Sequence, residues 1–228
     1  MKVIITGGTG MIGKGVLLEC LDSDIVSEVL AIGRKSLNID HKKLKELIIS
    51  NFEDYSTIEK ELLGYDACFY CLGISSAGMK EDAYHKITYS YTLALAKALY
   101  KINPGILFTY ISGAGTDSSE KGSSMWARVK GKTENDLLKI GFKQAVMFRP
   151  GIIIPERGIR SGTKSYQLMY DNFMWLIKII RLFWPESIVT TTAIGKAMIR
   201  LLNTKSSKTI LDPKDILALS AQIKNSND

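Results

Sequence analysis

The sequence predicts an α/β fold, a doubly wound parallel sheet with helices on both faces. A β-branched run at residues 3–6 leads into a glycine-rich turn, Gly7-Gly8-Thr9-Gly10-Met11-Ile12-Gly13. An apolar pattern with helical spacing follows this turn, and segments of strand and helix character then alternate as far as Arg149. Such alternation is typical of parallel strands joined by right-handed helical crossovers.

The glycine-rich turn indicates a phosphate-binding site. Glycines let the backbone approach a pyrophosphate closely, and the helix that follows points free N–H groups and the positive end of its dipole at it. The turn stands after the first strand, where the first unit of a dinucleotide-binding Rossmann fold belongs. We therefore predict that the cofactor contacts Gly7, Thr9, Gly10, Met11, Ile12 and Gly13.

The second expected strand, residues 28–33, ends at Gly33-Arg34-Lys35. In dinucleotide-binding folds this point faces the adenosine ribose, and an acidic residue here would bind the 2′-hydroxyl. The sequence has two cations instead: Arg34 offers a planar fork to a 2′-phosphate, and Lys35 offers a point charge. The pattern favours NADP over NAD, and its alternative is a solvated basic turn.

The third expected strand, residues 47–50, is followed by Asn51 and Phe52. We expect Asn51 to meet the edge of the adenine and Phe52 to flank its ring. The alternative is a helix cap at Asp54 or Ser56, and both interpretations can hold together.

The fourth expected strand, residues 67–73, ends where the nicotinamide ribose is expected. We predict cofactor contacts there from Cys71, Leu72 and Gly73. Cys68 and Cys71 lie in a strand and not at a helix N-terminus, which favours buried apolar packing over a redox pair. The small residues of the next helix, 91–99, suit core packing and also permit a homodimer face.

The fifth expected strand, residues 106–111, ends at Ser112. The following helix carries Trp126 and Lys130, which share one face because they are four residues apart. The sixth strand, 145–149, leads into Pro150, Gly151 and Ile152.

The alternation of strand and helix segments ends by Pro155, and the composition of the chain changes beyond it. A polar, glycine-bearing loop precedes a strongly apolar helix at residues 166–184, which we expect to pack over the open end of the sheet. A membrane-surface or partner-binding helix is the alternative. We expect the remainder to contain a helix at 193–202, a strand at 209–211 and a short helix from Pro213.

The composition indicates one domain with a sizeable core. The 228 residues are 46% hydrophobic, so we expect a single domain over 1–228, with a dinucleotide-binding core (1–155) and a C-terminal substrate-side lid (156–228). The three cysteines favour a reducing, cytoplasmic location, and no apolar run is long enough to span a bilayer.

The net charge of +7 admits an anionic partner. The basic residues are spread along the chain with no nucleic-acid motif, so we expect no nucleic acid. The charge and the apolar helix leave peripheral membrane contact open. The two histidines, His41 and His85, have no companion motif, so we expect no metal.

The pattern Thr6-Gly7-x-x-Gly10-x-x-Gly13 resembles the N-terminal fingerprint of the short-chain dehydrogenase/reductases, in the spacing of their extended and atypical branches. Further matches are Gly33-Arg34, Asn51-Phe52, Leu72-Gly73, Ser112, Lys130 and Arg149-Pro150-Gly151. The chain is similar to the Tat-interacting-protein-type oxidoreductases and, behind them, to the NAD-dependent epimerase/dehydratases. The resemblance covers nearly the whole chain.

The resemblance implies a Tyr-x-x-x-Lys pair and a serine as the catalytic groups. Lys130 and Ser112 match that lysine and serine, and the resemblance also implies cofactor contacts from Lys130, Pro150, Gly151 and Ile152. Trp126 stands at the tyrosine position, and an indole N–H donates a hydrogen bond but does not serve as an acid or base near neutral pH. Strand five ends Ser112-Gly113, where the family often has two serines and the second is commonly catalytic.

These observations leave three functions. The first is NADPH-dependent reduction of a small carbonyl-, quinone- or flavin-like acceptor without the usual tyrosine. The alternative is a catalytically silent NADP-binding sensor or regulatory protein, which the tryptophan motivates directly. A nucleoside-diphosphate-sugar epimerase or dehydratase is weaker, because the chain after the sixth strand is short for a nucleotide-sugar domain.

Overall fold

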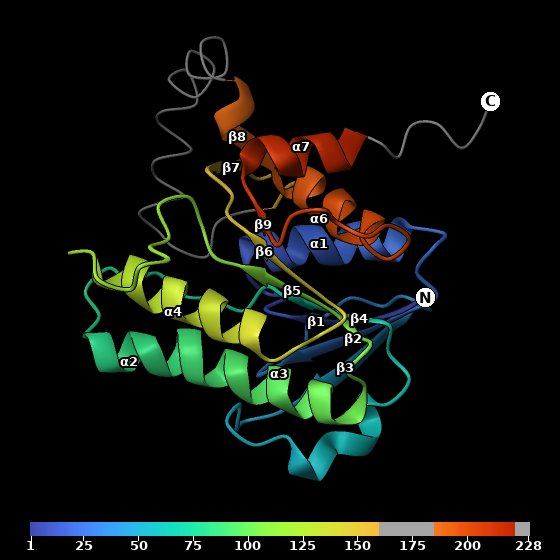
Figure 1. Cartoon of the computed structure of the whole chain (residues 1–228). Coiled ribbons are helices and arrows are strands. Elements are labelled where there is room, and N and C mark those ends of the chain that lie inside the picture. Colours follow the sequence, from blue (N-terminus) through green and yellow to red (C-terminus); the bar gives the residue numbers. More distant parts are fainter. Residues whose placement is uncertain (160–184, 222–228) are drawn as a thin grey trace.

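A seven-stranded parallel sheet lies between two layers of helices (Figure 1). The computed structural model describes residues 1–159 and 185–221. The strand order is β3-β2-β1-β4-β5-β6-β9, and every neighbouring pair is parallel. The predicted doubly wound Rossmann fold is confirmed. The predicted helix at 166–184 falls outside the described residues.

The sheet is built from continuous apolar runs at its centre. Val3, Ile4 and Ile5 of β1 are fully buried, because helices cover both faces of a parallel sheet. The strands are β1 (Lys2–Thr6), β2 (Glu28–Gly33), β3 (Leu44–Ile48), β4 (Ala67–Tyr70), β5 (Leu107–Ile111), β6 (Gln144–Phe148) and β9 (Ile210–Leu211).

The third strand begins earlier than the sequence predicts. Leu44 pairs with Val29 and Ile48 with Gly33, so the strand is 44–48 and not 47–50. The physical reason is that β3 is an edge strand with exposed positions, and its Lys45 and Glu46 break the apolar run on which the prediction relied.

Each face of the sheet has its own helical layer (Figure 1). One layer contains α1 (Met11–Asp22), α6 (Thr191–Arg200) and α7 (Pro213–Ala221). The other contains α2 (Glu81–His85), α3 (Tyr91–Ile102) and α4 (Met125–Lys139), with a π-helical turn, Lys86–Ser90, joining α2 to α3. Short 3₁₀ helices occupy Ser56–Leu62 and Pro185–Ser187.

Most of the described residues of the predicted lid pack against the main sheet and its helices. β7 (Ile152–Ile154), which the sequence analysis leaves unassigned, pairs with β8 (Ile188–Thr190) in a separate two-stranded sheet. β9 then extends the main sheet beside β6, and α6 packs against α1. Residues 185–221 therefore extend the main sheet and the helical layer that contains α1.

Two glycines allow α1 and α6 to lie close together. A Cβ on Gly15 of α1 would meet the Thr191 side chain at 2.5 Å, and one on Gly195 of α6 would lie 2.7 Å from Cγ of Glu19 and 3.2 Å from Cα of Val16. Larger side chains at either position would force the helices apart.

We predict that Gly195→Val lowers the free energy of unfolding by about 1–3 kcal/mol, the usual cost of overpacking a tight contact. Urea denaturation measures the change. Lys196→Val is the matched control, because Lys196 is exposed on the same helix and receives the same β-branched side chain. Helix propensity alone would favour Gly195→Val and disfavour Lys196→Val. A loss in Gly195→Val that is no greater than the loss in Lys196→Val would therefore contradict the packing argument.

Candidate functional site

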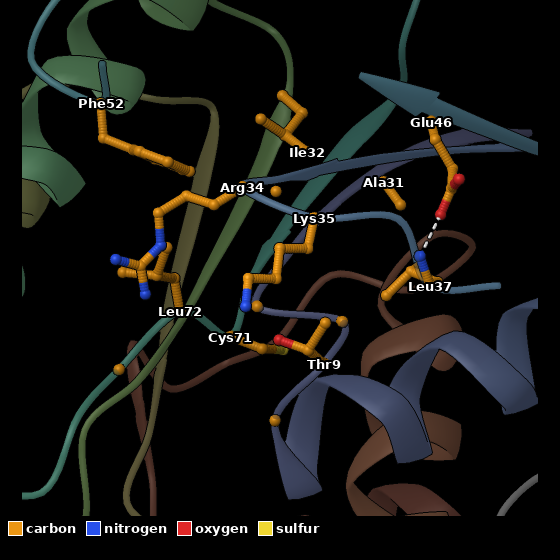
Figure 2. A pocket seen from close by; sticks show the side chains of 15 residues that line it. Thr9, Ala31, Ile32, Arg34, Lys35, Leu37, Glu46, Phe52, Cys71 and Leu72 are labelled. Carbon is orange, nitrogen blue, oxygen red and sulfur yellow. Dashed lines mark hydrogen bonds between the residues drawn. The ribbon is translucent and has the colours of Figure 1, made fainter. Parts of the chain in front are cut away.

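A cleft of about 530 Å³ opens at the carboxyl ends of β1, β2 and β4 (Figure 2). The chain reverses its direction of winding between β1 and β4, and ligands of open α/β sheets bind at such a point. The lining residues are Gly7, Gly8, Thr9, Gly10, Ala31, Ile32, Gly33, Arg34, Lys35, Leu37, Glu46, Phe52, Cys71, Leu72 and Gly73.

The glycine turn is held by contacts that leave no room for side chains. Gly7 has a φ of +71°, and a Cβ on it would lie 2.6 Å from the carbonyl oxygen of Cys71. A Cβ on Gly13 would lie 2.1 Å from the carbonyl oxygen of Gly7. The backbone of the turn therefore packs directly against the end of β4 and the first turn of α1.

The N-terminus of α1 can accept an anion. Gly10 is its N-cap, and no side chain caps it. Met11, Ile12 and Gly13, which were predicted as contacts, form the first turn of this helix and do not line the cleft. The backbone N–H groups of a first helical turn are the groups that a phosphate can satisfy.

Arg34 and Lys35 project from the end of β2 into the cleft (Figure 2). Within residues 1–159 and 185–221, neither cation has a carboxylate within ion-pair distance. Both are exposed. The cleft thus contains two positive charges that are available to a ligand.

Phe52 and Leu72 line the same end of the cleft as Arg34 (Figure 2). The Phe52 ring is buried and stacks on Tyr91 at 5.6 Å between centroids, so it offers a fixed apolar wall. Asn51, predicted at the adenine edge, does not line the cleft: its Oδ1 accepts the N–H of Glu53 at 2.9 Å and closes a local turn.

The residues at the end of β4 form another wall of the cleft. Cys71, Leu72 and Gly73 line the cleft as predicted by their position, and the N–H of Leu72 donates to the Thr6 hydroxyl at 3.1 Å. Burial raises the pKa of the Cys71 thiol to about 12, so this side chain is neutral and acts as packing.

A buried polar network surrounds the end of β5. Glu134 of α4 is fully buried, pairs with Arg149 and lies 2.5 Å from the Ser112 hydroxyl, which is also 3.0 Å from the carbonyl oxygen of Phe148. Lys130 donates from Nζ to the carbonyl oxygen of Ser112. The Ser112 hydroxyl therefore faces the interior, and its backbone oxygen holds the lysine.

The other residues implied by the family resemblance lie outside the cleft lining. Trp126, one turn before Lys130 on α4, packs over Gly115, whose Cβ would lie 3.4 Å from the indole ring. Pro150 accepts the Ala114 N–H at 2.9 Å. Ile152 packs with Met11 around Ile188, and Gly151 lies against Ser187, whose carbonyl oxygen would be 2.5 Å from a Cβ.

The sequence analysis did not identify six of the lining residues. Gly8, Ala31, Ile32 and Gly33 flank the predicted contacts, and their positions in the glycine turn and at the end of β2 could have indicated them. Leu37 contacts Gly8, with Cδ2 at 3.1 Å from where a Cβ would stand, and Glu46 reaches the cleft from β3. No periodic pattern in the sequence predicts the contacts of Leu37 and Glu46, because both contacts depend on the path of the loop after β2.

The described residues contain no group of three or more His, Cys, Asp or Glu side chains that could hold a metal ion. In the same part of the chain, no helix is both long and apolar enough to cross a membrane.

Comparison with known proteins extends the sequence resemblance. Residues 3–123 match the model of the NAD dependent epimerase/dehydratase family. Protein HTATIP2 of Rattus norvegicus is 29% identical over 158 residues, 68% of this chain and 64% of that protein. Protein FMP52-2, mitochondrial, of Scheffersomyces stipitis is 30% identical over 165 residues, 71% of this chain and 70% of that protein. This chain thus matches about two thirds of each relative.

Solved structures share the fold at low identity. The Bordetella bronchiseptica enzyme WbmH in complex with NAD+ has a TM-score of 0.68 and 17% identity, over 92% of this chain and 74% of that one. UDP-glucose 4-epimerase of Thermotoga maritima with UDP-glucose has a TM-score of 0.66 and 14% identity, over 100% of this chain and 84% of that one.

The predicted cytoplasmic location is contradicted by the comparison. The fungal relatives from Scheffersomyces stipitis and Candida albicans are named as mitochondrial proteins. The prediction relied on cysteine usage, which distinguishes reducing from oxidising compartments and does not separate one reducing compartment from another.

The titration of Lys130 gives a testable pH dependence. Burial lowers the pKa of this lysine from 10.5 to about 8, and the nearby Glu134 carboxylate opposes the shift. Between these two values the unfolded chain binds a proton that the folded chain does not, so the free energy of unfolding rises with pH across this window. We predict that Lys130→Met removes this rise.

Denaturation of both proteins from about pH 7 to about pH 10 measures the difference. Lys97→Met, which removes an exposed lysine of α3, controls for the change in net charge. A difference in the free energy of unfolding between the wild type and Lys130→Met that stays constant over the whole pH range would contradict the lowered pKa of Lys130.

Proposed function

The chain belongs to the NAD-dependent epimerase/dehydratase family, and from this membership we propose that it is an NADP-dependent oxidoreductase. Its acceptor is a small carbonyl-, quinone- or flavin-like molecule. When bound, the reduced cofactor supplies a hydride. The observation that carries the choice of NADP is the pair of unpartnered cations, Arg34 and Lys35, in the same cleft as the uncapped N-terminus of α1.

The lining residues fit a dinucleotide in one direction. The N–H groups of the glycine turn and of the first turn of α1 hold the pyrophosphate. The Arg34 guanidinium lies beside Phe52 and Leu72 (Figure 2), where it binds the 2′-phosphate and covers the adenine. The end of β4 continues from Cys71 and Leu72 through Gly73 toward the nicotinamide ribose, with Lys130 and residues 150–152 beyond it.

The supply of the proton distinguishes this chain from tyrosine-dependent relatives. Trp126 has no ionisation near neutral pH, and the Ser112 hydroxyl is directed at Glu134 and Phe148. The role of Ser112 in this proposal is to hold Lys130 through its carbonyl oxygen. An acceptor of the quinone or flavin type suits such a site, because it can take its proton from water.

We predict that Arg34→Ala raises the Kd for NADPH roughly tenfold or more and leaves that for NADH nearly unchanged, since a hydrogen bond to a charged group is worth ~1.5–3 kcal/mol. Titration of nicotinamide fluorescence measures both constants. Lys42→Ala removes an exposed cation that does not line the cleft, and it should affect neither. Equal weakening of both cofactors by Arg34→Ala would exclude the 2′-phosphate assignment.

The second candidate is a silent NADP-binding sensor, and Trp126 favours it. The two functions are separated by mixing the protein and NADPH with menadione, flavin mononucleotide or benzaldehyde and following the nicotinamide absorbance. We expect oxidation with the quinone or the flavin. Tight NADPH binding without turnover of any acceptor would instead support the sensor.

Placing a tyrosine at position 126 tests whether the missing acid limits carbonyl reduction. Trp126→Tyr should raise benzaldehyde reduction about 100-fold, the lower end of the usual gain from a placed acid, and leave menadione reduction within about threefold. Trp126→Phe is the control for the loss of the indole. No gain with the aldehyde would show that proton supply does not limit the reaction.

A further inference from the structure

Glu46, on the edge strand β3, holds the loop that carries the two cations of the cleft. Its Oε1 accepts the backbone N–H of Leu37 at 2.6 Å (Figure 2), and its Oε2 accepts the Ser36 hydroxyl at 2.7 Å. The Ser36 hydroxyl in turn accepts the N–H of Asn38 at 3.1 Å. Both carboxylate oxygens are therefore engaged by one short stretch of the loop.

The two cations are fixed from both sides. Before them, Gly33 is paired with Ile48, and its carbonyl oxygen accepts the N–H of Ile49 at 2.9 Å. After them, Ser36 and Leu37 are tied to Glu46. Only Arg34 and Lys35 lie between these anchors, and both side chains project into the cleft, away from Glu46 (Figure 2).

The orientation of Glu46 also leaves the cations free. Its carboxylate lines the same cleft, but within residues 1–159 and 185–221 it hydrogen-bonds to Ser36 and Leu37 and pairs with neither cation. A carboxylate without these two hydrogen bonds would compete with a bound phosphate for Arg34 and Lys35.

From this geometry we infer that Glu46 is a positioning residue for the 2′-phosphate of NADP, acting through the loop that presents Arg34 and Lys35. The inference rests on the proposed choice of NADP. The expected effect is opposite to that of simple charge repulsion: the negative Glu46 side chain increases the affinity for the phosphate, because its carboxylate accepts hydrogen bonds that order the loop.

The variants Glu46→Leu and Glu46→Gln distinguish ordering from charge. Leucine removes both hydrogen bonds, so we expect the Kd for NADPH to rise about fivefold, a modest effect because the hydrogen bonds are exposed, with the Kd for NADH within about twofold. In Glu46→Gln, the amide oxygen can accept from Leu37 and the amide N–H can donate to the Ser36 hydroxyl. Its NADPH affinity should therefore stay within about twofold of the wild type.

A double-mutant cycle adds a readout that a structural role would not move. In a chain that already has Arg34→Ala and Lys35→Ala, Glu46→Leu should change the NADPH Kd by less than about twofold. Asp215→Leu is the matched control: Asp215 also accepts from a backbone N–H, that of Asp212 at 3.3 Å, and from a side chain, Lys208, and it does not line the cleft.

Four results would overturn the inference. Tighter NADPH binding by both Glu46 variants would mean that the carboxylate only repels the phosphate. A fivefold loss that persists without Arg34 and Lys35 would mean that Glu46 supports the fold. A wild type that binds NADH as tightly as NADPH would remove the proposed choice of NADP and this inference with it, whereas a wild-type preference that Glu46→Leu leaves intact would remove the inference alone.

Discussion

The contact between the glycine turn and the end of β4 is the constraint on which the rest of this structure depends. Gly7 lies so close to the backbone of Cys71 that any side chain would collide with it. This approach joins the end of β1 to the end of β4 at the switch point and starts α1, which no side chain caps, beside the cleft that Gly10 lines. A bulkier turn would separate the anion-binding helix end from the walls that border it.

Binding and chemistry are carried by different parts of the fold. The cleft is made of backbone, apolar walls, two cations and the Glu46 carboxylate, and it lies at the ends of β1, β2 and β4 and beside the edge strand β3. The residues that correspond to catalytic groups lie at the end of β5 and on α4, where Glu134 and Arg149 form a buried ion pair and engage Ser112. Removing one member of such a pair leaves an uncompensated buried charge, so this network strongly restrains the geometry around Lys130. Under the proposed function, Trp126 at the tyrosine position would therefore alter proton transfer and leave the walls of the cleft unchanged.

The sequence predicted the features that repeat and missed those that depend on the path of a loop. Continuous apolar runs such as Val3–Ile5 identified the buried strands, and the glycine spacing located the cleft, because both follow from local sterics. The predicted start of the edge strand β3 was three residues too late, since the exposed Lys45 and Glu46 do not form an apolar run. Asn51 and Ser112 have the expected chemistry at the expected positions, yet each hydrogen-bonds to its own surroundings. Glu46 could not be found, because its role exists only once the loop from Arg34 to Asn38 has folded back onto β3.

The packing of α6 on α1 affects the order in which the molecule can be completed during synthesis. The helix that presents its N-terminus to the cleft lies within the first 22 residues, and the helix that covers its outer face ends at Arg200. In a nascent chain, the face of α1 that packs on α6 therefore stays uncovered until residues 191–200 have left the ribosome. The segment that matches the family model, residues 3–123, contains only half of this contact. The emergence of residues 191–200, and not that of the segment that matches the family model, sets the moment at which α1 acquires this cover.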